Sequence, residues 1–263
     1  MRDLRLFATH EHPLHPSGLR VLIVCPWRAA MSFLFEPDEG PPGPAADTGT
    51  AVHVAVHAMH RGKSAAECLD TMGTNVRRYP QADLTDAAAL FLTYAKDPRN
   101  RNTKVLLAEH PIRFQISPAP EDPTQEAIQV IGTLDQVRDD GSGPKLWDVK
   151  TSKKDPMELL HLHTFQAAAY CIGASVELDC VVQPGGLILP RRYRPDGSGP
   201  AFQHFAWSWK DIPQIMEAVR HAVARVRAGH LYHVPNESCV WCAAKSPDLC
   251  LPKLQRTLEE LRR

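Results

Sequence analysis

Two acidic segments on either side of a short turn constrain this chain more than any other feature of its sequence. The first, residues 132–135, lies in an apolar, β-rich stretch and ends at Asp135. The second, residues 148–151, begins at Asp148 and follows the turn RDDGSG at residues 138–143. Such a turn is typical of a connection between two antiparallel strands. The sequence therefore predicts a hairpin with Asp135 on one strand and Asp148 and Lys150 on its neighbour.

Asp148 and Lys150 are two residues apart on the predicted strand, so their side chains leave the same face of the sheet. A surface hairpin with scattered charges would also account for these residues. Two carboxylates and an ammonium in one place are costly to assemble, however, and a divalent cation between the acids would make them a phosphodiester-cleaving site.

Length and charge narrow the class of protein. The 263 residues suffice for one large core, and 30 basic residues balance 30 acidic ones. A protein that merely coats nucleic acid usually carries a basic excess, which this chain lacks. It also lacks an apolar run of 18 residues and an apolar signal-peptide core near Met1, so we expect a cytoplasmic protein without a membrane partner.

The order of expected elements predicts an α/β fold. Residues 1–16 hold three histidines among prolines and resemble a flexible tail. Helices are expected from residue 48 and over 64–77 and 84–96, and one long or broken strand over 104–116. After the hairpin come a helix at 156–172, strands at 181–190 and 201–209, and a helix at 211–229. One domain over residues 1–263 is the economical interpretation.

The seven cysteines point to thiols or metal ligands, since a chain without a secretion signal has little use for a disulfide framework. Cys239, Cys242 and Cys250 lie in one loop, within a predicted region of residues 230–263 that ends in a charged helix packed on the domain. Tetrahedral zinc and a four-iron cluster both need a fourth ligand. Cys25 is our candidate, and His230 or His233 would instead complete a zinc site. The remaining cysteines, Cys68, Cys171 and Cys180, are expected to be buried thiols.

Taken in order, these motifs resemble the PD-(D/E)XK nucleases. The pattern comprises Cys25-Pro26, residues 49–53 (GTAVH), Glu109, Gly132-x-x-Asp135, Asp148-x-Lys150-Thr151, Gln166-x-x-x-Tyr170, Cys239-x-x-Cys242 and Cys250. It is most similar to the RecB-like branch with an iron–sulfur clasp, which includes CRISPR-adaptation exonucleases, the AddB nuclease domain and phage relatives. The resemblance spans residues 17–250. It implies a restriction-endonuclease-like fold, with a mixed central sheet flanked by helices and a C-terminal cysteine-ligated metal-cluster region.

The resemblance also implies roles for individual residues. His53, Asp135, Asp148 and the backbone carbonyl of Val149 would bind Mg²⁺ or Mn²⁺, and Lys150 would orient the attacking water. Gln166 and Tyr170, one helical turn apart, would lie beside the site and hold the DNA or the lysine. Glu109 would be an acid that contacts the metal ligands without binding the metal, or an ordinary charged residue of the strand. Cys25, Cys239, Cys242 and Cys250 would hold a [4Fe–4S] cluster that clasps the ends of the chain, with structural Zn²⁺ as the alternative.

The sequence departs from the family pattern at three places. Leu134 replaces the proline that names the family, and Asp148 stands where many relatives have glutamate, within the named pattern. The gap between Cys242 and Cys250 is longer than the usual spacing.

The implied activity is that of an exonuclease on single-stranded DNA or DNA ends. It would serve repair, recombination, phage DNA metabolism or CRISPR adaptation, with a helicase, recombinase or integrase as partner. Basic candidates for the DNA groove are Arg113, Lys153, Lys154, Arg191, Arg192 and Arg194.

Two other functions compete with the nuclease. A catalytically inactive scaffold or DNA-binding subunit would be expected to have lost the metal ligands. A zinc hydrolase built on His161 and His163 lacks a third ligand at suitable spacing, so these are better explained as surface histidines.

Overall fold

The computed structural model describes residues 3–35, 43–194 and 201–231. Its contacts divide the chain into two compact units, where the sequence suggested one domain. The first unit comprises residues 1–40, 113–131 and 213–263, and the second comprises residues 41–112 and 132–212. Each unit is described by itself below. Among the described residues, no helix combines the length and apolar character that crossing a membrane requires.

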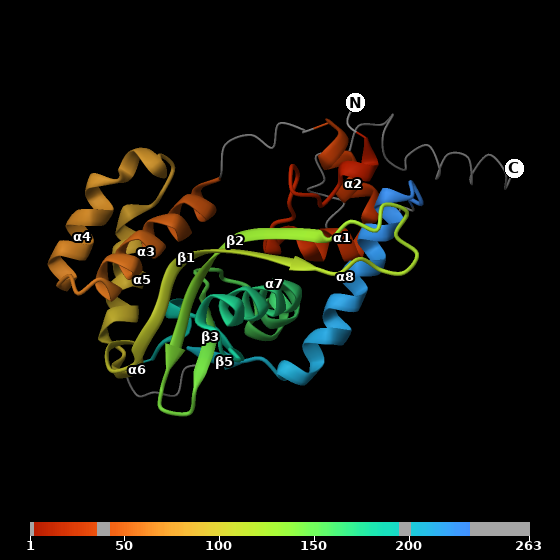
Figure 1. The fold of residues 1–263 in the computed structure, drawn as a ribbon. Helices are drawn as coiled ribbons and strands as arrows, with labels where there is room; N and C mark the ends of the chain where they lie inside the picture. The colour runs from red at the N-terminus through yellow and green to blue at the C-terminus, as the bar shows by residue number, and fades with distance from the viewer. Residues whose placement is uncertain (1–2, 36–42, 195–200, 232–263) are drawn as a thin grey trace, which may run out of the picture. The chain divides into compact units, whose positions relative to one another are not determined.

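A five-stranded mixed sheet runs in the order β1-β2-β3-β4-β5 (Figure 1). Its strands are β1 (Lys104–Ile116), β2 (Ile128–Asp139), β3 (Pro144–Val149), β4 (Gln183–Ile188) and β5 (Phe202–His204). Strands β2 and β3 pair antiparallel, β3 and β4 pair parallel, and β4 and β5 pair antiparallel. The α/β fold with a mixed sheet flanked by helices, expected from the order of elements, is thereby confirmed.

The predicted hairpin is formed by β2 and β3. Their register pairs Gln136 with Trp147 and ends with Asp139 opposite Pro144. The turn depends on Gly141 and Gly143, whose φ angles of 92° and 101° lie in the left-handed region that glycine adopts without a steric penalty. Both glycine N–H groups donate to Oδ1 of Asp139, at 2.8 and 3.3 Å. The turn therefore fixes the register that brings Asp135 of β2 near Asp148 of β3.

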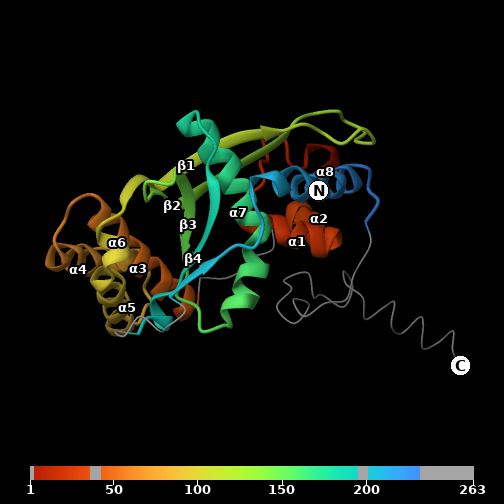
Figure 2. The same cartoon turned by 90° about the horizontal axis from the view of Figure 1, so that it is seen from below.

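Helices cover both faces of the sheet in the second unit. Figure 2 shows α7 (Pro156–Leu178) on one side of β3 and β4, with α3 (Pro44–His60), α4 (Ala65–Thr74) and α5 (Leu84–Lys96) on the other. The core of the second side joins buried residues of α3, α4 and α5 to Trp147, Val149 and Ile188 of the sheet. A short helix, α6 (Pro98–Arg101), follows α5.

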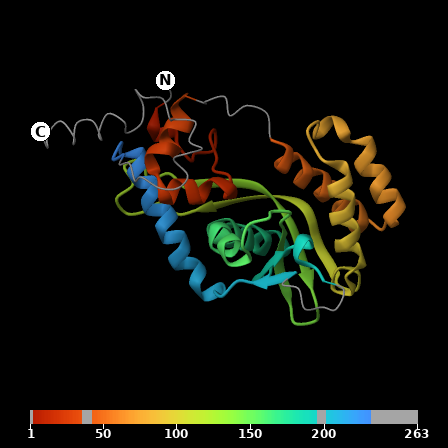
Figure 3. The ribbon, with the colours of Figure 1, turned by 180° about the vertical axis from the view of Figure 1, so that it is seen from behind.

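Helix α7 lies across the sheet (Figure 3) and connects the parallel strands β3 and β4. Its Gly173 permits this packing, because a Cβ there would lie 2.4 Å from Cδ1 of Ile112 in β1. The helix runs six residues beyond the expected end at residue 172 and stops at Asp179, whose φ is 49°. Helix α3 likewise begins at Pro44, earlier than expected, since proline is well suited to a first helical turn.

The described part of the first unit contains α1 (Leu19–Val24), α2 (Pro26–Phe35) and α8 (Ile212–Arg227), whose first residue falls in the second unit. Residues 1–16, expected to form a flexible tail, are ordered from Asp3 onward. Phe7 and Ala8 are buried, and Leu14 forms a parallel bridge with Val130. The guanidinium of Arg227 donates to the carbonyl oxygens of both Phe7 and Ala8, which fixes this segment. Of the predicted cysteine region, residues 232–263 lie outside the described residues.

Candidate active site

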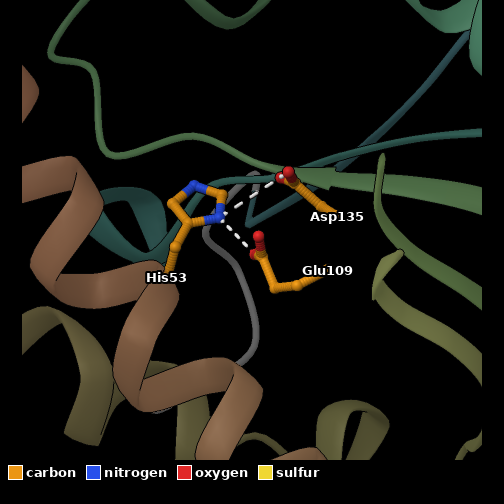
Figure 4. A group of neighbouring side chains, drawn as sticks. All are labelled: His53, Glu109 and Asp135. Atoms are coloured by element: carbon orange, nitrogen blue, oxygen red, sulfur yellow. Dashed lines mark hydrogen bonds and ion pairs between the residues drawn. The ribbon is translucent and has the colours of Figure 1, made fainter. Parts of the chain in front are cut away.

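Three side chains from different elements of the second unit converge at the edge of the hairpin (Figure 4). His53 comes from α3, Glu109 from β1 and Asp135 from β2, and one potential ligand atom of each lies within 4.8 Å of the others. Nδ1 of His53 lies 2.9 Å from Oε1 of Glu109 and 3.6 Å from Oδ1 of Asp135. This group contains one nitrogen and two carboxylates, a donor set that suits a divalent cation.

Local backbone features position these side chains. Helix α3 approaches the loop after β3 closely, since a Cβ on Gly49 would lie 3.1 Å from Oγ1 of Thr151. That approach places His53, one turn after Gly49, beside the end of β3. Glu109 has a φ of 45°, the left-handed conformation that non-glycine residues rarely adopt, within the long strand β1. A strand residue with this backbone no longer follows the simple alternation of side chains, and Glu109 contacts His53 instead.

The second acidic segment joins the group through the hairpin. Oδ2 of Asp135 accepts a 2.7 Å hydrogen bond from the backbone N–H of Val149, across the two strands. The carboxyl groups of Asp135 and Asp148 are near enough for each to shift the pKa of the other. Nζ of Lys150 lies 2.8 Å from Oδ2 of Asp148, and both side chains are largely buried, at 21% and 5% exposed. As the hairpin pattern predicts, the two acids and the lysine lie together.

Burial and mutual repulsion give these groups shifted acidities. Burial, and then the charge of Asp148, raise the pKa of Asp135 well above its usual value. Burial opposes ionisation of Asp148, but the charge of Lys150 and the neighbouring carboxyl of Asp135 outweigh it and lower the pKa of Asp148. Burial would also lower the pKa of Lys150, and the two aspartates raise it instead. The two neighbouring carboxyl groups therefore have pKa values that are shifted in opposite directions.

His53 carries a positive charge in this arrangement. Burial would lower its pKa, but the charges of Asp135 and Glu109 outweigh burial and raise the pKa to about 9. At neutral pH the ring is therefore protonated, and it donates from Nδ1 to Glu109 and from Nε2 to the carbonyl oxygen of Val149, 3.1 Å away. The positive charge of the His53 ring thus balances the negative charge of the carboxylates, as a bound metal ion would.

The donor set fits a divalent cation. Oδ1 of Asp148 is buried and has no hydrogen-bond partner among the described residues, which is costly for a carboxylate oxygen. The pKa of Asp135 is raised by burial first and then by the charge of Asp148, so two acids stand close together in a buried place. Both features are expected of ligands that a cation would pair. Asp148 lies outside the tight group of His53, Glu109 and Asp135, to which it connects through Asp135.

Gln166 and Tyr170 lie on α7 beside this cluster. Nε2 of Gln166 donates to the hydroxyl of Tyr170 at 3.2 Å. Burial raises the pKa of Tyr170 to about 12, and the nearby aspartates act in the same direction. His163, which the sequence suggested was a surface residue, belongs here too. Its Nδ1 lies 2.7 Å from Oε1 of Gln166, and its charge contributes to the lowered pKa of Asp148. Its position one turn before Gln166 was the available signal.

Some predicted basic groove residues are held by the protein itself. Arg191 forms an ion pair with Asp86 and also donates to the carbonyl oxygen of Thr151. Lys154 pairs with Glu158 at 2.6 Å, and Arg192 donates to the carbonyl oxygens of Lys153 and Lys154. Arg191, Arg192 and Lys154 therefore have partners within the protein itself.

The predicted cysteine ligands are only partly described. Cys25 is buried at the end of α1 and forms no disulfide with any residue that the structure describes, whereas Cys239, Cys242 and Cys250 lie outside the described residues. The prediction that the other three cysteines are buried holds for two of them. Cys68 and Cys171 are buried as expected, but Cys180 is exposed, because α7 ends just before it at Leu178.

The fold and the site define an α/β protein with a buried acidic centre suited to a divalent metal. A family model of the PD-(D/E)XK nuclease superfamily matches residues 13–247, most of the chain. The chain therefore belongs to the PD-(D/E)XK nuclease superfamily, whose members are generally nucleases.

Other comparisons add little to that assignment. No curated protein matches the chain. A solved structure titled "Crystal structure of SSO0001" is similar at 14% identity and a TM-score of 0.45, covering 94% of this chain and 89% of that one. That likeness is too distant to refine the family assignment.

Proposed function

We propose that this protein is a metal-dependent nuclease that hydrolyses phosphodiester bonds in DNA, as an exonuclease on single strands or free ends. The observation that carries the proposal is the buried contact of Lys150 with Asp148, 2.8 Å, beside the carboxyl of Asp135. A buried ammonium between two acids is expensive to maintain, and a structural role could be filled more cheaply by apolar side chains. Hydrolysis of a phosphodiester makes use of all three groups.

Asp135, Asp148 and His53 would hold Mg²⁺ or Mn²⁺, together with the carbonyl oxygen of Val149. Such an ion would polarise the scissile phosphate and lower the pKa of a bound water. Lys150 would donate to the attacking water or to the charge that develops on the phosphate, which its raised pKa supports. On α7, Gln166 and Tyr170 would hold the lysine or the DNA in place.

Two finer parts of the proposal rest on the sequence resemblance. The chain would fall in the RecB-like branch and act in DNA repair, recombination, phage DNA metabolism or CRISPR adaptation, beside a helicase, recombinase or integrase. Cys25 would join Cys239, Cys242 and Cys250 in a [4Fe–4S] cluster. We expect the protein to be brown, with broad visible absorbance, after anaerobic purification. The Cys25→Ser variant should lack this absorbance. Colourless protein with stoichiometric zinc would reject the cluster.

The competing function is a catalytically inactive scaffold or DNA-binding subunit. Such a protein would not need to keep the contact of Lys150 with Asp148. It would not need the ion pairs of His53 with Glu109 and Asp135 either. The complete set therefore favours the enzyme.

The deciding experiment assays Asp148→Ala and Lys150→Ala on end-labelled DNA with Mg²⁺ or Mn²⁺. Both variants are expected to lose at least about 100-fold in cleavage rate, because each removes a group that acts on the reacting phosphate. The matched control is Lys210→Ala, which removes an exposed lysine in the short helix Trp209–Asp211 and should leave the rate unchanged. Cleavage that persists in both site variants at the control's rate would refute the proposal.

A further inference from the structure

A cleft of about 670 Å³ opens beside the metal-site group in the second unit. His53 and Glu109 line one part of it, so the cleft reaches the candidate site directly. Three cationic side chains line another part: Arg61 at the end of α3, Lys63 just after it, and Arg78 in the short helix Val76–Arg78. A single cavity thus connects the acidic centre to a basic wall.

The basic wall is available to a ligand. Arg61 and Arg78 are exposed, and their side chains have no hydrogen bond or ion pair with any residue that the structure describes. Among the described residues, the ammonium group of Lys63 donates to Oγ1 of Thr71 alone, at 2.9 Å. Arg191, by contrast, is tied to Asp86. Among the described residues that line the cleft, Glu109 is the one carboxylate.

The remaining lining groups suit a phosphate–sugar backbone. Asn75 has a second amide N–H beyond the one that it donates to the carbonyl oxygen of Thr71, and amide, arginine and lysine groups are usual contacts to phosphate oxygens. The hydroxyls of Thr50 and Thr71 line the cleft too, but they donate to backbone carbonyl oxygens. Nδ1 of His57, which also lines the cleft, is buried without a hydrogen-bond partner among the described residues. No Phe, Tyr or Trp belongs to the described lining, so the cleft offers no platform on which bases could stack.

The size of the cleft favours one strand over two. Its volume falls within the range of roughly 300–1,000 Å³ that is typical of pockets for small ligands. That space suits a short length of single strand.

We propose that this cleft binds the backbone of the single strand being cut, next to the scissile phosphate, with Arg61 and Arg78 as its phosphate contacts. The inference rests on the proposed nuclease function and names the part of the substrate that the protein holds. Because the contacts are to phosphates, they bind the strand without regard to its sequence and contribute mainly to KM.

The test compares Arg61→Gln, Arg78→Gln and the double variant with Arg77→Gln. Arg77 is the matched control, because it is the exposed neighbour of Arg78 in the same short helix and does not line the cleft. The kinetic constants kcat and KM are measured with Mn²⁺ on a fluorescent single-stranded oligonucleotide over a range of salt concentrations.

Each single variant is expected to raise KM roughly three- to tenfold and the double variant more, with kcat changed less than about twofold. The slope of log KM against log salt should fall by about 0.7 for each phosphate of the single strand that a variant no longer neutralises. Arg77→Gln should match the wild type. A double variant with the same KM as Arg77→Gln overturns the inference. So does a double variant whose KM rises by the same factor on a blunt duplex as on the single strand.

Failure of the nuclease function would be distinguishable. If the wild-type protein cleaves nothing, the proposed function is wrong, and fluorescence anisotropy with the same oligonucleotide still decides the role of the cleft. Binding that weakens in the double variant but not in Arg77→Gln supports the cleft as a strand-binding site. Equal affinity in all of these proteins refutes it.

Discussion

Nε2 of His53 donates to the carbonyl oxygen of Val149 across 3.1 Å, so two of the groups predicted to bind one metal ion contact each other directly. The same ring donates from Nδ1 to Glu109. With a pKa of about 9, His53 carries the positive charge that balances the surrounding carboxylates. A divalent cation at this site would replace that charge, and His53 would have to release a proton to become a ligand.

Metal binding should therefore stabilise the folded chain, and Asp135 should be required for it. At a metal concentration of about 100 times Kd, the free energy of unfolding should rise by about 2.7 kcal/mol. Thermal unfolding with Mn²⁺ and with EDTA measures this difference. Asp135→Asn should abolish it, whereas Asp140→Asn, a change in the exposed hairpin turn, should preserve it. An unchanged Mn²⁺ effect in Asp135→Asn would exclude this residue as a ligand.

Glu109 combines a charge contact with an unfavourable backbone conformation, and two substitutions separate these effects. Glu109→Gln removes the charge opposite His53 and keeps the φ of 45°. Glu109→Gly removes the charge and also tolerates that φ. Both should weaken metal binding by roughly tenfold. The glycine variant should be about 1 kcal/mol more stable than the glutamine variant, because a left-handed φ costs a side-chain-bearing residue about that much. Calorimetric titration and denaturant unfolding measure the two quantities, and equal stabilities would contradict the strain.

The hairpin and the contact of Asp148 with Lys150 follow from local sequence rules. A glycine-bearing turn fixes the register, and residues two apart on a strand share a face. The contact of Glu109 with His53 could not be predicted in the same way, because the backbone conformation of Glu109 depends on the surrounding sheet. Gln136 and Arg138 look like polar positions of an exposed hairpin, yet both are buried. Hydrogen bonds to Tyr94 from α5, remote in sequence, make that burial possible.

A buried ion pair should dominate the stability of the described part of the first unit. Nη1 of Arg227 lies 2.7 Å from Oδ2 of Asp122, and both side chains are fully buried. Arg227→Met leaves the carboxylate without its charged partner and should cost about 3–5 kcal/mol. The control is Arg5→Met, which breaks an exposed pair with Asp3 and should cost less than about 1 kcal/mol.

A second substitution isolates the uncompensated charge. Asp122→Leu added to Arg227→Met removes the stranded carboxylate and should restore part of the stability. Recovery should be incomplete, because the guanidinium also donates to backbone carbonyl oxygens, including that of Phe7. Urea unfolding of the four proteins gives the comparison. A double variant no more stable than Arg227→Met would show that the missing hydrogen bonds to carbonyl oxygens, and not the charge, determine the cost.

His60 should make the stability of the second unit depend on pH. Burial, and then the charge of Arg138, lower its pKa from 6.5 to about 4, while Nε2 contacts the hydroxyl of Tyr94 at 2.7 Å. The unfolded chain therefore binds a proton between pH 6.5 and 4 that the folded chain does not. Stability from this group is complete above pH 6.5 and falls by on the order of 2 to 3 kcal/mol as the pH drops to about 4. His60→Gln should flatten that part of the urea-unfolding profile, and His161→Gln, at an exposed histidine of α7, should not. Parallel profiles for His60→Gln and the wild type would assign the acid sensitivity to other groups.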